Sequence, residues 1–158
     1  MSNTISSNSI TIIIVLYKES YDLISNTLNK IENFKKIIID NDGNDLLKKK
    51  ILSRFSIDQY VLNKKNNGFS RGYNQGIKLS KTEFTLVLGP DCIIFEKDIK
   101  ILVAKLLQYN NALIVSPTSY DELNNLSYAG GPLPEYAEKN QILEIKGDVC
   151  VDNTLGAC

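Results

Sequence analysis

Residues 66–76 combine residue types that bind phosphorylated ligands. The stretch reads NNGFSRGYNQG, which places three glycines and four side-chain amides around the expected start of a helix. Glycine lets the backbone approach a ligand closely, and a helix N-terminus presents N–H groups that have no intrahelical partner. Further along the chain an apolar run ends at GPD, positions 89–91, and a carboxylate is a ligand that Mg²⁺ prefers. Together these features predict a site for a phosphorylated, metal-bound small molecule.

The elements expected to position these residues are apolar strands that alternate with amphipathic helices. Residues 10–16 are almost all β-branched and apolar, which is typical of a strand buried on both faces of a sheet. Ser20 can cap the helix that follows it, and Asn44 or Asp45 can cap the next one. The pattern predicts strands at 10–16, 36–40, 57–62, 83–88 and 112–116, and helices at about 20–34, 44–55, 68–80 and 96–109. This alternation predicts an α/β fold, a doubly wound, mainly parallel sheet with helices on both faces.

Polar side chains follow the carboxyl ends of four expected strands. They are Tyr17 and Glu19, Asp40 and Asp42, Asn63 with residues 66–68, and Asp91. In a doubly wound sheet these ends line one crevice, where ligands bind. Plainer alternatives exist for single residues, since DNDG at 40–43 is also typical of a turn and Arg71 can be an exposed helix residue. The prediction of a site therefore depends on the group as a whole.

The composition excludes several classes of function. The chain has no histidine, which removes His-activated serine or cysteine catalysis and histidine-based metal sites. Lys plus Arg and Asp plus Glu both number 18, so no net charge attracts nucleic acid. Residues 66–76 have neither the Gly-Lys-Ser/Thr end of a P-loop nor the glycine spacing of a dinucleotide fingerprint. Three cysteines in no metal-ligand spacing predict reduced thiols, and Cys92 is interpreted as a small buried side chain rather than a nucleophile.

Four motifs occur in an order that resembles the family 2 glycosyltransferases. They are the apolar first strand that ends at Tyr17, IIIDN at 37–41, NGFSRGYNQG at 67–76 and LGPD at 88–91. The sequence is most similar to the rhamnosyltransferase-like branch, whose pattern is Asn-x-Gly-Phe-Ala-x-Gly-x-Asn-x-Gly followed by Leu-Asn-Pro-Asp. LGAC at 155–158 is also similar to the Ser-Gly-Ala-Cys segment that leads into the acceptor-binding half of these enzymes. The ordered set is more specific for the family than for the sugar.

This resemblance implies a GT-A fold and an inverting, metal-dependent transfer in polysaccharide biosynthesis. A sugar, with rhamnose as the candidate, would pass from a dTDP-, UDP- or GDP-sugar donor to a glycan or lipid-linked acceptor. Asp40 would contact the base, Arg71 would lie near the diphosphate, and Asp91 would hold Mg²⁺ or Mn²⁺ on it. A bound cation stabilises the negative charge that grows on the leaving diphosphate. The implied donor-binding residues are Tyr17, Glu19, Asp40, Asn67, Gly68, Arg71 and Asn74.

The expected domain organisation follows from changes in composition along the chain. Residues 1–9 are polar and predict a disordered lead-in, residues 10–117 the nucleotide-sugar-binding α/β domain, and residues 118–158 the truncated start of an acceptor-side region. We therefore expect only the donor-binding half, with the C-terminal acceptor part missing. No apolar run approaches the ~20 residues that span a bilayer. We expect a cytoplasmic protein, with peripheral association at the inner face of the membrane as an open alternative.

The sequence departs from the family pattern in two places. Gly89 replaces the usual Asn before Pro90-Asp91, which leaves the carboxylate in place. The family's catalytic base belongs to a Glu-Asp motif expected beyond Cys158, and Glu135, Glu138 and Asp152 do not match that motif. Transfer by this chain alone is therefore expected to be weak or absent. One alternative is a non-catalytic nucleotide-sugar-binding or scaffold domain that partners another transferase, and a weaker one is a receiver-like domain.

Overall fold

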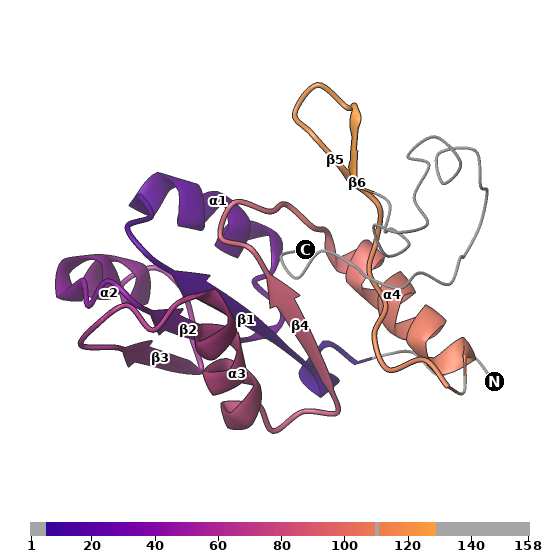
Figure 1. The fold of residues 1–158 in the computed structure, drawn as a ribbon, viewed down its shortest axis with the longest axis horizontal. Helices are drawn as coiled ribbons and strands as arrows, with labels where there is room; N and C mark the ends of the chain where they lie inside the picture. The colour runs from indigo at the N-terminus through magenta and orange to yellow at the C-terminus, as the bar shows by residue number, and fades with distance from the viewer. Residues whose placement is uncertain (1–5, 110, 129–158) are drawn as a thin grey trace, which may run out of the picture.

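A computed structural model describes residues 6–109 and 111–128 of the chain. In these residues four strands alternate with four α-helices, and a small hairpin follows (Figure 1). The elements are a 3-10 turn at Ser7–Ser9, β1 Ile10–Leu16, α1 Tyr21–Lys30, β2 Lys35–Asp40, α2 Asp45–Leu52, β3 Gln59–Leu62, α3 Phe69–Leu79, β4 Phe84–Leu88, α4 Glu96–Gln108, β5 Ser119–Tyr120 and β6 Leu126–Tyr128.

The first four strands form one parallel sheet in the order β3-β2-β1-β4. The central strand β1 pairs on one side with β2, where Ile13 lies opposite Ile37, and on the other side with β4. All seven residues of β1 are buried. This confirms the expected α/β fold, because a strand that is apolar along its whole length must be covered on both faces.

Alternate residues of β1 contribute to two apolar layers. Ile12 and Ile14 pack in one layer with side chains of α1, α2 and α4. Ile13 and Val15 point to the other face and pack with Tyr73 of α3. The two-residue period of a strand thus distributes the helices over both sides of the sheet, as expected.

Helix α3 crosses from one edge of the sheet to the other. It follows β3 at one edge and leads to β4, which lies on the far side of β1 (Figure 1). The strand order therefore reverses between β1 and β4, and a crevice outside the carboxyl ends of the strands is expected at such a reversal.

Helix caps follow the sequence closely. The Ser20 side chain accepts a hydrogen bond from the Leu23 N–H at 3.2 Å at the start of α1. Of the two candidates for α2, Asn44 is the cap, because its Oδ1 accepts from the Leu47 N–H at 3.0 Å. Such bonds satisfy N–H groups that a helix start leaves free.

The strand predicted at 112–116 does not form, so that prediction is wrong. Residues 112–118 are irregular, and Leu113 and Ile114 are 91% and 75% exposed. Instead, β5 and β6 form an antiparallel hairpin further along. A short apolar run becomes a strand only when another strand pairs with it, and β4 pairs only with β1 among the described residues.

Two further expectations concern the ends of the chain. Residues 7–9 form a 3-10 turn, and Ser6 caps it by accepting from the Asn8 N–H. The disordered lead-in over residues 1–9 stays a prediction, because residues 1–5 lie outside the described residues. The expectations about residues 129–158, among them the LGAC segment, lie outside the described residues. No helix in the described part of the chain is long and apolar enough to cross a membrane.

Candidate functional site

A hollow of about 240 Å³ lies at the carboxyl edge of the sheet, beside the reversal between β1 and β4. Its walls come from the end of β1, the turn after β2, the start of α3 and the turn after β4. The lining residues are Val15, Tyr17, Glu19, Asn41, Asn66, Gly68, Phe69, Tyr73 and Pro90. Segments far apart in the sequence therefore meet where the fold predicts a ligand site.

The turn after β1 forms the first wall of the hollow. The Tyr17 N–H donates to a Glu19 carboxylate oxygen at 2.6 Å, which folds the turn back on itself. Lys18 has a positive φ of 67°, and its ammonium lies 5.1 Å from the centre of the Tyr17 ring. The Tyr17 ring is 43% exposed. The turn thus presents an aromatic face at the rim of the hollow, and the donor-binding role of Tyr17 stays a prediction.

Asp40 is fully buried at the end of β2, and its carboxylate already has three donors. One oxygen accepts from the N–H groups of Asp42 and Gly43 at 2.8 and 3.1 Å, and the other accepts from the Tyr60 hydroxyl at 2.9 Å. Burial, followed by the bond to Asp40, raises the pKa of Tyr60, so this hydroxyl stays protonated and donates. Asp40 therefore fixes the turn between β2 and α2, which is the plainer alternative for this stretch. Its contact with a base stays a prediction.

Three side-chain amides connect the strand ends to α3. Asn63 Nδ2 donates to Asn41 Oδ1 at 2.8 Å and to Gln75 Oε1 at 2.9 Å, and Asn41 Nδ2 donates to the Gly68 carbonyl at 3.2 Å. These bonds join β2, β3 and α3 behind the hollow. Gln75 is not among the residues predicted for the site, although its amide lies in the glycine-rich stretch.

Helix α3 begins at Phe69, and the residue at its N-cap is Gly68, which has a positive φ of 79° and no side chain to cap the helix. The first N–H groups of α3 are therefore open to a ligand at the wall of the hollow. Phe69 is exposed there and meets the Tyr73 ring edge-on, with 4.6 Å between the ring centroids. Neither aromatic residue was singled out from the sequence as a binding residue.

The other residues expected from α3 lie beside the hollow rather than in its wall. Arg71 and Asn74 are exposed on α3, and Asn67 is partly exposed in the turn before it. None of the three belongs to the lining. Their polar side chains remain available to the outer part of a ligand that extends beyond the hollow.

Asp91 follows β4 in a turn closed by the Cys92 N–H, which donates to the Gly89 carbonyl at 3.2 Å. The carboxylate is exposed, and its neighbour Pro90 lines the hollow. Cys92 is partly exposed, and its thiol lies 3.9 Å from Asp91 Oδ1. No group of three metal-binding side chains occurs in residues 6–109 and 111–128. One carboxylate fits a hard cation that takes its other ligands from phosphate oxygens and water.

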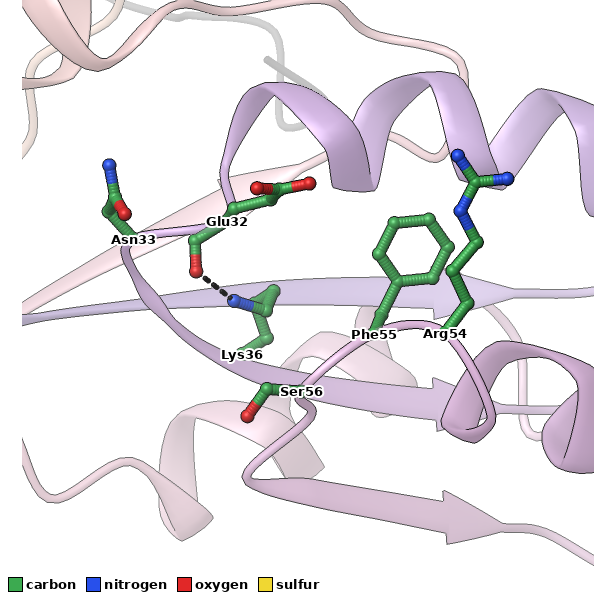
Figure 2. Close-up of a pocket in the computed structure, with 6 residues that line it drawn as sticks. All are labelled: Glu32, Asn33, Lys36, Arg54, Phe55 and Ser56. Atoms are coloured by element: carbon green, nitrogen blue, oxygen red, sulfur yellow. Dashed lines mark hydrogen bonds between the residues drawn. The ribbon is translucent and has the colours of Figure 1, made fainter.

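A second hollow, of about 360 Å³, lies at the opposite edge of the sheet (Figure 2). It is lined by Glu32, Asn33, Lys36, Arg54, Phe55 and Ser56. The buried Lys36 ammonium donates to the carbonyls of Glu32 and Phe34 at 2.8 and 2.6 Å. This lysine therefore closes the turn after α1.

Burial lowers the pKa of Lys36 and outweighs the nearby carboxylates of Asp58 and Glu32. The unfolded chain, with a pKa near 10.5, therefore binds more protons than the folded chain in the interval below that value. Stability should rise with pH through this interval. We expect the free energy of unfolding of the native protein to increase relative to that of Lys36→Met as pH rises toward 10.5. Urea unfolding across this pH range measures it, with exposed Lys35→Met as the control; equal slopes for both variants would contradict the prediction.

Comparison with known proteins gives one family match. The model of glycosyl transferase family 2 matches residues 11–156, which include the parallel sheet except for Ile10 and all the residues of the hollow. No curated protein matches the chain.

Proposed function

Because the chain belongs to glycosyl transferase family 2, we propose that the hollow at the carboxyl edge of the sheet binds the nucleotide-sugar donor of a glycosyl transfer. The family that the sequence motifs predict is confirmed. The finer assignments are part of this proposal. They are a dTDP-, UDP- or GDP-sugar as donor, rhamnose as the candidate sugar, a glycan or lipid-linked acceptor, and inversion at the anomeric carbon.

The observation that carries the proposal is the combination of groups at the reversal between β1 and β4. Exposed aromatic rings of Tyr17 and Phe69 occur with an uncapped helix start at Gly68. Aromatic faces suit the planar base of a nucleotide, and free helix N–H groups suit its phosphates. A hollow of about 240 Å³ is close to the lower end of ligand-pocket sizes, so part of the donor would lie outside it.

We assign each predicted residue a role relative to the donor as part of this proposal. Tyr17 and Glu19 would line the nucleoside end. The Gly68 N–H already donates to Asn66 Oδ1 at 2.8 Å, so the N–H groups that follow it at the start of α3 would meet the phosphates, with Asn67 and Gly68 beside them. Arg71 and Asn74, exposed on α3, would meet the diphosphate and the sugar. Asp40 would act mainly by fixing the turn that brings Asn41 into the wall.

Asp91 would hold a divalent cation, Mg²⁺ or Mn²⁺, against the donor diphosphate. Its exposed carboxylate next to Pro90 supports this assignment, because the donor can supply the remaining oxygen ligands. The bound cation would neutralise charge on the nucleoside diphosphate as it leaves. We assign the general base to no described residue.

Calorimetric titration of the protein with dTDP-, UDP- and GDP-sugars, with Mn²⁺ and with EDTA, tests the proposal. We expect saturable binding of one nucleotide class, and tighter binding when Mn²⁺ is present. The free nucleoside is the control, because it lacks the diphosphate that the cation and the helix start would bind. Failure of every nucleotide sugar to bind in the presence of metal would overturn the donor site.

An acceptor assay separates transfer from binding alone. Release of nucleoside diphosphate that requires a glycan acceptor would support transfer. Donor binding without any release would favour the alternative of a non-catalytic donor-binding domain.

A further inference from the structure

The segment that carries Asp91, residues 88–92, is held by hydroxyl groups from helices on both faces of the sheet. From α3, the buried Tyr73 hydroxyl donates to the Leu88 carbonyl at 2.9 Å. From α1, the Thr27 hydroxyl donates to the Pro90 carbonyl at 2.8 Å and lies 3.2 Å from the Cys92 carbonyl. The segment therefore has anchor points on either side of Asp91.

Thr27 is the less expected of the two anchors. It is 1% exposed in the middle of α1, where apolar neighbours such as Ile24 and Leu28 pack on the sheet. A threonine or serine inside a helix commonly bonds a carbonyl of its own helix four residues earlier. Ser25 does so, because its hydroxyl donates to the Tyr21 carbonyl. The Thr27 hydroxyl instead leaves its helix and reaches a turn more than 60 residues away in the sequence.

We propose that Thr27 is a positioning residue, which fixes the orientation of Asp91 toward a divalent cation bound with the donor diphosphate. The inference rests on the proposed function of the hollow. The Pro90 carbonyl belongs to the peptide group directly before Asp91, so the bond from Thr27 fixes the direction in which the carboxylate leaves the turn.

The position of Asp91 matters because the described part of the chain offers no cluster of further acidic side chains beside it. A cation held by one protein carboxylate and by the donor diphosphate requires these two groups to be correctly positioned relative to each other. Groups that orient metal ligands typically change metal affinity ten- to a hundredfold when they are removed. Thr27 would have this effect without contact to the donor, since it is not part of the lining.

Three variants of α1 test the inference. Thr27→Val keeps the shape and loses the hydroxyl, and Thr27→Ser keeps the hydroxyl and loses the methyl group. Ser25→Ala is the matched control, because it removes a buried hydroxyl from the same helix whose bond stays within that helix. Circular dichroism confirms that each variant is folded before the two measurements below.

The first measurement is hydrogen exchange of the Cys92 amide in metal-free protein, since this N–H closes the Asp91 turn. We expect about tenfold faster exchange in Thr27→Val, and native exchange in Thr27→Ser and Ser25→Ala, as the loss of one buried hydrogen bond would produce. Native exchange in Thr27→Val would overturn the inference without bearing on the donor site.

The second measurement is the ratio of UDP dissociation constants in EDTA and in Mn²⁺, with dTDP or GDP in its place if that nucleotide binds. We expect Thr27→Val to reduce this ratio about tenfold with little change in EDTA, and Thr27→Ser to restore it. A native ratio in Thr27→Val, or an equal loss in Thr27→Ser, would overturn the positioning role. A native protein whose affinity does not depend on Mn²⁺ would overturn the proposed metal site and this role together.

Discussion

Asp91→Asn is expected to remove most of the metal-dependent part of nucleotide binding while the fold stays intact. The substitution keeps the size of the side chain but removes its negative charge. A hard cation held by a single protein ligand depends on that charge. The carboxylate is exposed, and its hydrogen bond in the described structure is the 3.9 Å contact from the Cys92 thiol. We therefore expect at least about a tenfold loss of affinity in Mn²⁺, or about 1.4 kcal/mol, and little change in EDTA. Titration with the nucleoside diphosphate under both conditions measures the effect.

Asp42→Asn is the matched control for this experiment. Asp42 is also exposed at the carboxyl edge of the sheet, and its replacement changes the net charge by the same amount. The structural role at that turn belongs to the Asp42 N–H, which donates to Asp40 and is unaffected by the substitution. If both variants lose affinity equally, the effect is general electrostatic attraction. If Asp91→Asn binds as tightly as the native protein in Mn²⁺, Asp91 is not the cation ligand.

The parts of the fold that the sequence predicts are those set by local patterns. The apolar run at 10–16 predicts a strand covered on both faces, and β1 is buried along its whole length. Ser20 and Asn44 cap the helices that they precede. Because carboxyl ends of parallel strands share one edge, Tyr17, Glu19 and the start of α3 could be placed together from strand order alone.

The parts that the sequence does not predict depend on contacts between elements far apart in the chain. In the sequence Thr27 is simply one more residue on the buried face of a helix. Only the packed structure shows that its hydroxyl contacts the carbonyls of Pro90 and Cys92. The same holds for the amide bonds of Asn63 with Asn41 and Gln75. At 112–116 the error has the same origin, since an apolar run predicts a strand only if the pairing edge is known.

The glycines of residues 66–76 show most clearly the difference between what a local pattern predicts and what packing between distant elements decides. All three were interpreted as sites of close approach to a ligand. Gly68 lines the hollow, but Gly72 and Gly76 face the sheet. A Cβ at Gly72 would lie 2.8 Å from Val15 Cγ1, and one at Gly76 would lie 2.3 Å from Ile13 Cγ2. Two of the three therefore serve close packing between α3 and β1.

Gly76→Ala should accordingly be among the most destabilising single-methyl substitutions in the chain. In an exposed helix the change from glycine to alanine would stabilise by about 1 kcal/mol. Here the added methyl group meets the γ2 methyl carbon of the β-branched Ile13, which is fully buried in the central strand and cannot rotate away. We expect overpacking to prevail and to lower the free energy of unfolding by at least about 2 kcal/mol, measured by urea denaturation.

A double-mutant cycle with Ile13→Ala identifies the cause of that loss. Removing the Ile13 side chain removes the atoms that the new methyl group would strike, so Gly76→Ala should cost far less in the Ile13→Ala background. Lys78→Ala, on the exposed side of α3, is the control for helix propensity. Equal costs of Gly76→Ala in both backgrounds would mean that α3 does not lie this close to β1. If the added methyl group pushes α3 away from β1, Gly68 also moves away from Asn41, whose side-chain amide donates to the Gly68 carbonyl. A destabilised but folded Gly76→Ala protein should therefore also bind the donor nucleotide more weakly. Close packing of α3 on β1 would then be what holds the helix start at the wall of the donor site.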